Sequence, residues 1–489
     1  MNRTSASIII MCIALALAGC ARRPHDARRA GTLPAIYPDY IGTTIPAGIA
    51  PLNFCIDSVD LVDVEVRGSK GGHLAANGRW ACFDIDDWHR LTALNAGGRL
   101  TFSVCTLAGG QWTRYDDFDI SVSTDPLDDF GVVYRKIAPG YETFSHIGIY
   151  QRNISTFDEY AIVESTAAPG QCINCHAFRG TDPDHFQLHF RGLRGATLIQ
   201  TEGRRRWLNT KTDRTISGCA YPYWHPTGRY CAYSLNLVHQ RFFAAGEQYI
   251  EVFDKASDAV VLDVGRNQLI TSPCLQTDEL ETYPVFAADG QSIFYCTSKR
   301  YDNHADFARI RYDLCRVPFD AATGRIGTRP DTVIHASAQG KSVTFPSPSH
   351  DGRFLLYCQA DFGVFPINHR EADLWLLDLR TGLTHPLDKA NSPHTESYHS
   401  WSTCSRWIVF SSRRDDDLHS RLFVAHIDTC GRADKAFMLP QHNPRRLYDR
   451  SHYAYNMPEF VARKVDFDTQ AAFGELFSDE REQTTMRPE

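Results

Sequence analysis

The stretch that decides the fold reads Tyr221-Pro222-Tyr223-Trp224-His225-Pro226-Thr227-Gly228, and the apolar run Tyr230-Cys231-Ala232-Tyr233 follows it. This pattern is typical of a strand, a tight turn and a second strand that returns antiparallel. Related stretches begin at Tyr283, Phe345 and Tyr398, at intervals of about 60 residues. Their turns are marked by Gly228, Gly290, Gly352 and Ser405. A period of this length predicts a β structure built from repeated units.

Each copy continues into a third apolar strand, as at 250–253 and 314–319. Four-stranded units in series cover one another's faces and close into a propeller, although a non-closing β array is an alternative. The repeat resembles the TolB-like, WD-type propeller repeat, from which Cys404-Ser405 departs in the last copy. Partial copies flank these four: a hairpin at 197–208 and an opening strand at 456–461. We therefore expect an all-β fold with about six blades, with five or seven as alternatives.

Upstream of the repeats stands Cys172-Ile173-Asn174-Cys175-His176, which is C-x-x-C-H, the attachment sequence of c-type haem. On one helical turn, thiols three positions apart reach the two vinyl groups of one porphyrin, and the histidine binds the iron. The motif predicts one covalent haem c, held by Cys172 and Cys175 with His176 as proximal ligand. We expect it in a helix inserted at the entry to the propeller. A buried cysteine pair, a local disulfide or a redox centre are the alternatives.

The segment after the motif contains candidates for the sixth iron ligand. Pro183 after Asp182 suits the first turn of a helix. His189 is the predicted distal ligand because it lies close in sequence, and His185 is its rival on the same helix face. A methionine ligand would have to be remote, such as Met438 or Met457. Two histidines would give a lower potential than histidine with methionine.

The N-terminus predicts export from the cytoplasm. A basic start and the apolar run 8–18 end in Leu17-Ala18-Gly19-Cys20, which matches the lipobox of bacterial lipoproteins. The resemblance implies that the chain is cleaved before Cys20 and anchored to a membrane by lipid on that thiol. An ordinary secretory signal is the alternative. We expect a cell-envelope protein that most simply faces the periplasm.

The rest of the chain suggests no nucleic-acid partner, because the net charge is −7 without a dominant basic block. The sequence suggests six regions, listed here in order: 1–19 signal peptide; 20–45 tether; 46–135 β-sandwich-like domain; 136–215 first blade region with the haem segment; 216–465 propeller repeats; 466–489 polar tail.

Nearly the whole mature chain resembles a Bacteroidota family of TolB-like or cytochrome-c-related lipoproteins. The resembling stretches are 37–40, 45–54, 148–153, 172–178 and 221–228. The resemblance supports propeller and haem without naming a substrate. We therefore expect a membrane-anchored electron carrier with a redox or envelope protein as partner. The alternative is a non-enzymatic scaffold that binds a protein, peptide or glycan. An enzyme is disfavoured because no Gly-x-Ser-x-Gly occurs and only a short tail follows the repeats.

Overall fold

The computed structural model describes residues 24–138, 146–167, 171–192, 194–244, 250–478 and 480–488. These residues form two compact units. Unit 1 holds residues up to Gly42, then Pro51–Val122 and Pro440–Asp449, and unit 2 holds the remainder. Cys20 and the expected signal peptide lie outside the described residues. Among the residues described, no helix is long and apolar enough to cross a membrane.

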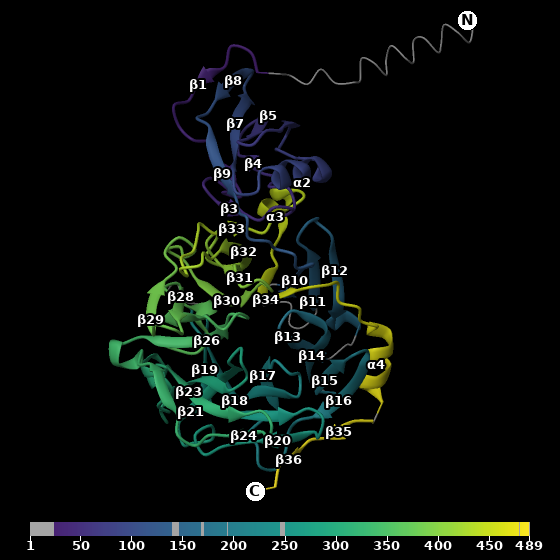
Figure 1. The fold of residues 1–489 in the computed structure, drawn as a ribbon, viewed down its shortest axis with the longest axis vertical. Coiled ribbons are helices and arrows are strands. Elements are labelled where there is room, and N and C mark those ends of the chain that lie inside the picture. Colours follow the sequence, from purple (N-terminus) through teal and green to yellow (C-terminus); the bar gives the residue numbers. More distant parts are fainter. Residues whose placement is uncertain are drawn as a thin grey trace, which may run out of the picture. The chain divides into compact units, whose positions relative to one another are not determined.

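Unit 2 is a β-propeller (Figure 1). Within the described residues its strands form six blades, numbered blade 1 to blade 6 in chain order, and blades 3 and 4 share one ten-stranded sheet. Blade 1 is β12 (Glu159–Glu164), β11 (Ile147–Asn153), β10 (Gly131–Ile137) and β34 (Ala454–Val461). Blade 2 is β13 (Gln171–Arg179), β14 (Asp182–Gly192), β15 (Ala196–Thr201) and β16 (Arg204–Asn209). Blade 3 is β17 (Cys219–Trp224), β18 (Tyr230–Phe242), β19 (Ile250–Asp263) and β20 (Gln268–Ile270).

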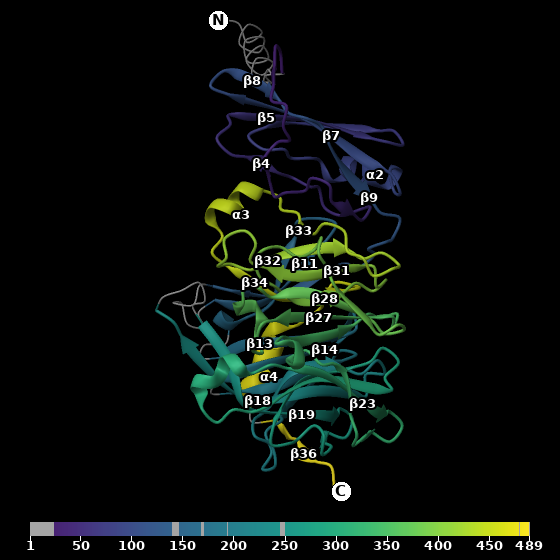
Figure 2. The same cartoon turned by 90° about the vertical axis from the view of Figure 1, so that its left-hand side faces the viewer.

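The other three blades repeat this order. Blade 4 is β21 (Leu280–Phe286), β22 (Ser292–Ser298) and β23 (Asp313–Asp320), with β24 (Arg325–Ile326) and β25 (Asp331–Ile334) both on β23. Blade 5 is β26 (Ser342–Pro348), β27 (Phe354–Ala360), β28 (Asp373–Asp378) and β29 (Leu383–Pro386). Blade 6 is β30 (Glu396–Trp401), β31 (Trp407–Ser412), β32 (Arg421–His426) and β33 (Phe437–Met438). A single parallel pairing, Ser257 with Leu280, links blades 3 and 4. Figure 2 shows the same strands after a turn of the view by 90°.

The all-β class and the propeller of about six blades expected from the repeats are confirmed. The turn residues behave as expected, because Gly228, Gly290 and Gly352 all take positive φ, between 70° and 75°. Ser405 adopts φ 58° at the same point of blade 6, so the turn is kept without glycine. Histidine and tryptophan side chains then join neighbouring blades: His225 Nε2 lies 3.1 Å from the carbonyl oxygen of Gly290.

The ring is closed by the C-terminal part of the propeller. β34 pairs antiparallel with β10 and supplies the inner strand of blade 1, as the partial copy at 456–461 predicted. Its yellow ribbon lies beside the blue ribbon of β10 in Figure 1. The predicted hairpin at 197–208 is also confirmed, as β15 and β16 of blade 2.

The segment expected as a polar tail is structured and covers the outside of blades 2 and 3. Helix α4 (Thr469–Phe477) buries Ala472, Phe473 and Leu476 in the core that blade 2 shares with blade 1. Strands β35 (Glu482–Gln483) and β36 (Thr485–Met486) then extend the edges of β16 and β20. Two arginines of β16 bind this segment, because Arg205 pairs with Glu475 and Arg206 with Glu482.

Two expectations around the cysteine motif are wrong. Cys172 to His176 lies on β13, the inner strand of blade 2, and not on an inserted helix. The helix expected after Pro183 is strand β14. The two segments pair antiparallel, and their exchanged backbone hydrogen bonds outweigh the local helix signals. Residues 136–215 consequently hold strands of two blades, and β10 already begins at Gly131.

Unit 1 is the β-rich domain expected near the N-terminus. Its main sheet has the order β1 (Arg28–Arg29), β8 (Gln111–Arg114), β7 (Arg99–Ala108), β5 (Leu61–Gly68), β6 (His73–Gly78), with β9 (Phe118–Val122) also on β7. A second small sheet pairs β2 (Ile36–Tyr37) with β4 (Cys55–Ile56). Helix α2 (Ile85–Leu94) is capped by Asp84 and packs Trp88 against Phe102 of β7. Helix α3 (Pro444–Arg450) also belongs to this unit. Strand β3 (Thr44–Ile45) belongs to unit 2.

The inter-blade turns allow a direct test of packing. In Gly290→Ala the new Cβ would lie 2.3 Å from His225 Nε2, whereas in Gly352→Ala it would lie 3.4 Å from the Ala288 Cβ. Both positions have left-handed φ, so each variant pays about 1–2 kcal/mol of backbone strain. We expect Gly290→Ala to cost clearly more than Gly352→Ala in urea unfolding, because only the former displaces His225. Equal losses for the two variants would contradict this assignment.

Candidate functional site

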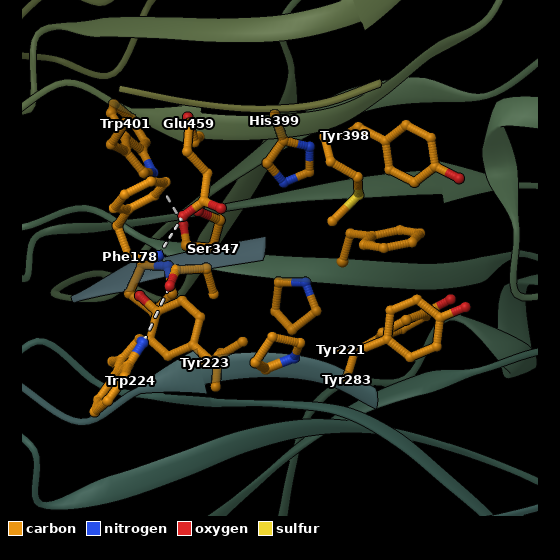
Figure 3. Close-up of a pocket in the computed structure, with 18 of the residues that line it drawn as sticks. Phe178, Tyr221, Tyr223, Trp224, Tyr283, Ser347, Tyr398, His399, Trp401 and Glu459 are labelled. Carbon is orange, nitrogen blue, oxygen red and sulfur yellow. Dashed lines mark hydrogen bonds between the residues drawn. The ribbon is translucent and has the colours of Figure 1, made fainter. Parts of the chain in front are cut away.

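The six inner strands surround a central pocket with an empty volume of about 1050 Å³, which includes the part open to solvent (Figure 3). Every inner strand contributes residues from the same part of its sequence. They are Cys175–Phe178 of β13, Tyr221–Trp224 of β17, Tyr283–Val285 of β21, Phe345–Pro348 of β26, Tyr398–Trp401 of β30 and Met457–Phe460 of β34.

The backbone turns these residues inward by breaking the strand pairing at one place. Pairing is irregular beside the first lining residue of the inner strands, as between Ala220 and Tyr223 of β17. Five first residues, Tyr221, Tyr283, Phe345, Tyr398 and Met457, have positive φ between 48° and 54°. A bulge of this kind leaves a residue unpaired and redirects its side chain. The repeated aromatic-Pro sequence therefore builds the pocket as well as the blades.

Aromatic rings form a continuous row along one side of the pocket. Ring centroids are 4.9 Å apart for Tyr221 and Tyr283, 4.2 Å for Tyr283 and Phe345, and 5.1 Å for Phe345 and Tyr398. Figure 3 shows Tyr221, Tyr283 and Tyr398 on one side of the view. Tryptophan Nε1 groups tie the walls together: Trp224 donates to Ala177 and Trp401 to Ser347. The side of the pocket that holds the ring row is therefore aromatic.

The polar groups gather on β30, β34 and β13, the inner strands of blades 6, 1 and 2. Cys175 and Met457 stand where the other inner strands have an aromatic residue. His176 and His399 stand at the second lining position, which is proline in the other four strands. Glu459 lies on β34, which packs against both β30 and β13. The pocket thus combines an apolar side with a side of two imidazoles, a thiol, a thioether and a carboxyl group.

His176 and Glu459 are in contact inside the pocket. His176 Nε2 lies 3.4 Å from Glu459 Oε1, and the His176 side chain has no solvent exposure. The main-chain N–H of Phe178 donates to Glu459 Oε2 at 3.1 Å. Burial, followed by the charge of Arg135, lowers the pKa of His176 to about 3. Burial raises the pKa of Glu459, although its side chain keeps 23% exposure. Near neutral pH the pair is therefore an uncharged imidazole facing a carboxyl group that protonates readily.

The histidine nitrogens of the pocket lack ordinary partners. Neither His176 Nδ1 nor Nε2 makes a hydrogen bond of good geometry within the described residues, and the same holds for His399 Nε2. Burial lowers the pKa of His399 to about 4, so this ring is also uncharged. Buried polar atoms normally find partners, and unpaired ones cost about 1–3 kcal/mol each. The main chain of Met457 contacts His176, and the main chain of Phe345 and Leu356 contacts His399.

The structure brings together only part of the set predicted from sequence. Cys175 and His176 line the pocket, but Cys172 does not. Cys172 is half-buried, burial raises the pKa of its thiol, and both cysteines are free, so they form no disulfide. The residues Cys175 and His176 fit a haem ligand set, whereas Cys172 fits only if its thiol turns toward the pocket. Among the described residues, no group of three or more His, Cys, Asp or Glu side chains is arranged to hold a bare metal ion.

His189 and His185 do not line the pocket. His189 faces Cys175 across the strand pairing, but its Nδ1 lies 3.0 Å from Thr197 Oγ1. His185 Nδ1 lies 2.8 Å from Asp182 Oδ2. Met438 is buried on β33, and Met457 does line the pocket. The sequence prediction missed His399 and Glu459. The available signal for His399 was its position in the fourth repeat, where the first three copies have proline.

A second cavity adjoins the central pocket and shares Gly180, Tyr223, Trp224, Pro348 and His350 with it. Its empty volume is about 930 Å³, again including open solvent. Charged residues lie here: Arg463 pairs with Asp184, and Arg179 with Asp182. The second cavity therefore places charged residues next to the central pocket.

No protein-family model and no curated protein sequence matches the chain. Among solved structures, TolB from Acinetobacter baumannii is similar over 78% of this chain and 86% of its own, with 12% identity and a TM-score of 0.43. A putative 6-phosphogluconolactonase from Bacteroides uniformis is similar over 82% and 100%, with 8% identity and a TM-score of 0.34. A puromycin-hydrolyzing peptidase from Mycobacterium tuberculosis is similar over 71% and 51%, with 14% identity and a TM-score of 0.34. These scores lie below 0.5, and the propeller assignment rests on the order of the chain's own sheets.

Proposed function

We propose that this protein is a cell-envelope electron carrier whose propeller holds one haem c in the central pocket. The haem is attached through Cys175 and Cys172, His176 binds the iron, and lipid on Cys20 anchors the chain to a membrane. The observation that supports this most is His176 itself. Its ring is fully buried and uncharged, its nitrogens lack hydrogen bonds, and it directly follows a cysteine in the pocket lining. An uncharged imidazole is the form that binds iron.

A bound haem would supply one-electron chemistry, and the residues of the pocket would set its surroundings. Phe178, Tyr223, Trp224 and Trp401 are aromatic residues of the pocket lining. Glu459 lies beside the His176 ring and restricts its orientation.

The first test is covalent haem after export in a host that matures c-type cytochromes. We expect haem-stained protein on a denaturing gel and a pyridine haemochrome spectrum. Because only Cys175 lines the pocket, Cys175→Ala is expected to lose nearly all covalent haem. Cys172→Ala is expected to keep a larger share, held by a single thioether. Cys404→Ala, which removes a partly exposed cysteine away from the motif, serves as the matched control.

Folded, exported protein that carries no covalent haem would overturn the proposal. Equal staining of wild type and the Cys172→Ala, Cys175→Ala double variant would overturn it as well. Circular dichroism of each variant checks that loss of haem is not loss of fold.

The second candidate is a binding scaffold without haem. The continuous row from Tyr221 to Tyr398 favours it, because a rigid aromatic wall binds flat or apolar groups of a peptide, glycan or protein partner. A haem-free protein with the same fold would favour this alternative.

A further inference from the structure

A short segment between β9 and β10 lies against blade 6. It consists of residues 123–129, which belong to unit 2 and form neither helix nor strand, and we call it the strap. At its first end, Ser123 donates its main-chain N–H to the carbonyl oxygen of Ile45 at 2.8 Å. At its last end, the Asp129 carboxyl group accepts from the main-chain N–H of Thr403 at 3.1 Å and from the Thr403 hydroxyl group at 2.5 Å. Both ends of the strap are therefore bound to other parts of unit 2.

The middle of the strap contacts β31 and the turn before it. The carbonyl oxygen of Pro126 accepts from Trp407 Nε1 at 3.1 Å, and Cys404 Sγ lies 3.1 Å from the same oxygen. Trp407 is fully buried, and Cys404 is partly buried. Moving Pro126 away from blade 6 would therefore uncover both side chains.

His426 of β32 makes the charged contact with the strap. Its Nε2 lies 2.7 Å from Asp125 Oδ2, and its Nδ1 lies 3.1 Å from Asp434 Oδ2. The His426 side chain is only 10% exposed. A neutral imidazole has one N–H and can donate to only one of these carboxylates, whereas the charged ring donates to both. Only the charged form of His426 therefore binds the strap and Asp434 at the same time.

The groups that face His426 favour its charged form. Burial lowers the pKa of His426, but the hydrogen bonds and charges of Asp434 and Asp125 outweigh burial and raise it above its ordinary value. Asp434 is itself kept ionised, because His426, a hydrogen bond from Thr44 and the charge of Lys389 lower its pKa. A raised pKa means that the contact is complete below the unfolded value of about 6.5 and is lost as pH rises through the folded value.

We propose that residues 123–129 are a pH-sensitive strap, closed over blade 6 while His426 is charged and released at Asp125 and Pro126 when His426 loses its proton. Release uncovers Cys404 and Trp407 and lengthens the unbound chain that precedes β10. The proposal does not involve the central pocket, so it does not depend on the proposed function.

The test measures how fast brief pulses of N-ethylmaleimide label Cys404 in the exported protein at pH 6 and pH 8.5, with mass spectrometry of the peptides as the readout. Labelling of the exposed Cys430 is the internal reference, because it corrects for the general rise of thiolate with pH. We expect the ratio of Cys404 to Cys430 labelling to rise about fivefold in wild type, as for a partly exposed ion pair at the strong end of its usual range. Asp125→Ala should give the high ratio at both pH values. Asp128→Ala, which changes an exposed residue of the same strap, is the matched control and should behave as wild type.

A labelling ratio that stays constant with pH in wild type would overturn the proposal. A rise with pH that is equally large in Asp125→Ala would overturn it too, because the titrating group would then not act through the strap. Asp434→Asn keeps the contact between His426 and Asp125 but removes one carboxylate, so its strap should be released at a lower pH than in wild type. An unchanged midpoint in this variant would show that His426 is not the switch. Circular dichroism confirms that each variant keeps its fold.

Discussion

A chain that ends at Tyr453 is expected to lose cooperative unfolding. This truncation removes β34, which is the inner strand of blade 1 and pairs with β10 from Gly131 to Ile137. It also removes α4, so the core of blade 2 loses Val461, Val465, Ala472, Phe473 and Leu476. The exposed edge of β10 would be open to pairing with other chains. We expect a broad thermal transition by circular dichroism and aggregation in gel filtration.

The control for this truncation is a chain that ends at Ser478. It keeps β34 and α4 and loses only β35 and β36, whose pairings with β16 and β20 are short. This chain should unfold cooperatively at a modestly lower temperature. If the chain ending at Tyr453 melted as sharply as the full protein, closure by β34 would not be what holds the ring.

His369→Gln is expected to destabilise the propeller by about 3–5 kcal/mol, the usual effect of removing one partner of a buried ion pair. His369 Nε2 lies 3.0 Å from Glu251 Oε2, and both side chains are only 1% exposed. His369 Nδ1 lies 3.3 Å from Glu371 Oε1. The contact joins blade 3, where Glu251 lies on β19, to the 3₁₀ turn after β27 of blade 5. Urea unfolding at pH 6 measures the loss.

The same pair predicts how stability depends on pH. The carboxylates of Glu251 and Glu371, working against burial, raise the pKa of His369 to about 9. A raised pKa means that the stabilisation is complete below the unfolded value of about 6.5 and is lost as pH rises through 9. We therefore expect the free-energy difference between wild type and His369→Gln to shrink by about 3 kcal/mol between pH 6 and pH 9.5.

His335→Gln is the matched control. His335 pairs with Asp313 at 2.8 Å, but its side chain is 66% exposed. An exposed pair contributes about 0–1 kcal/mol, so this variant should differ little from wild type at either pH. A difference between wild type and His369→Gln that stayed constant with pH would mean that His369 is uncharged in the folded protein.

Local patterns accounted for most of the propeller. Gly228, Gly290 and Gly352 identified the turns because a tight turn with positive φ depends on its own residues. The apolar runs around them identified the strands, and the opening strand at 456–461 was recognisable because it repeats the same pattern. Cys175 and His176 were identified for the same reason, since their motif is contiguous.

Local patterns failed where two competing structures fit one short segment. The motif around Cys172 and the Asp182-Pro183 pair were both consistent with helices when taken alone. In the folded chain they are neighbouring strands, and the backbone groups of β13 and β14 form hydrogen bonds with each other. The choice of His189 followed from that error, because it assumed that a residue close in sequence on a helix would lie next to the haem. His189 instead lies on strand β14, outside the pocket lining.

The sequence by itself determined the repeat, the turns and part of the candidate site, because these depend on residues that are near one another in the chain. Only the tertiary structure decided which side chains share the central pocket. His176, His399 and Glu459 come from three blades, and they meet only once β34 has closed the ring. The position of each side chain relative to the other two depends on how all six blades are arranged around the ring. No local sequence pattern contains this arrangement.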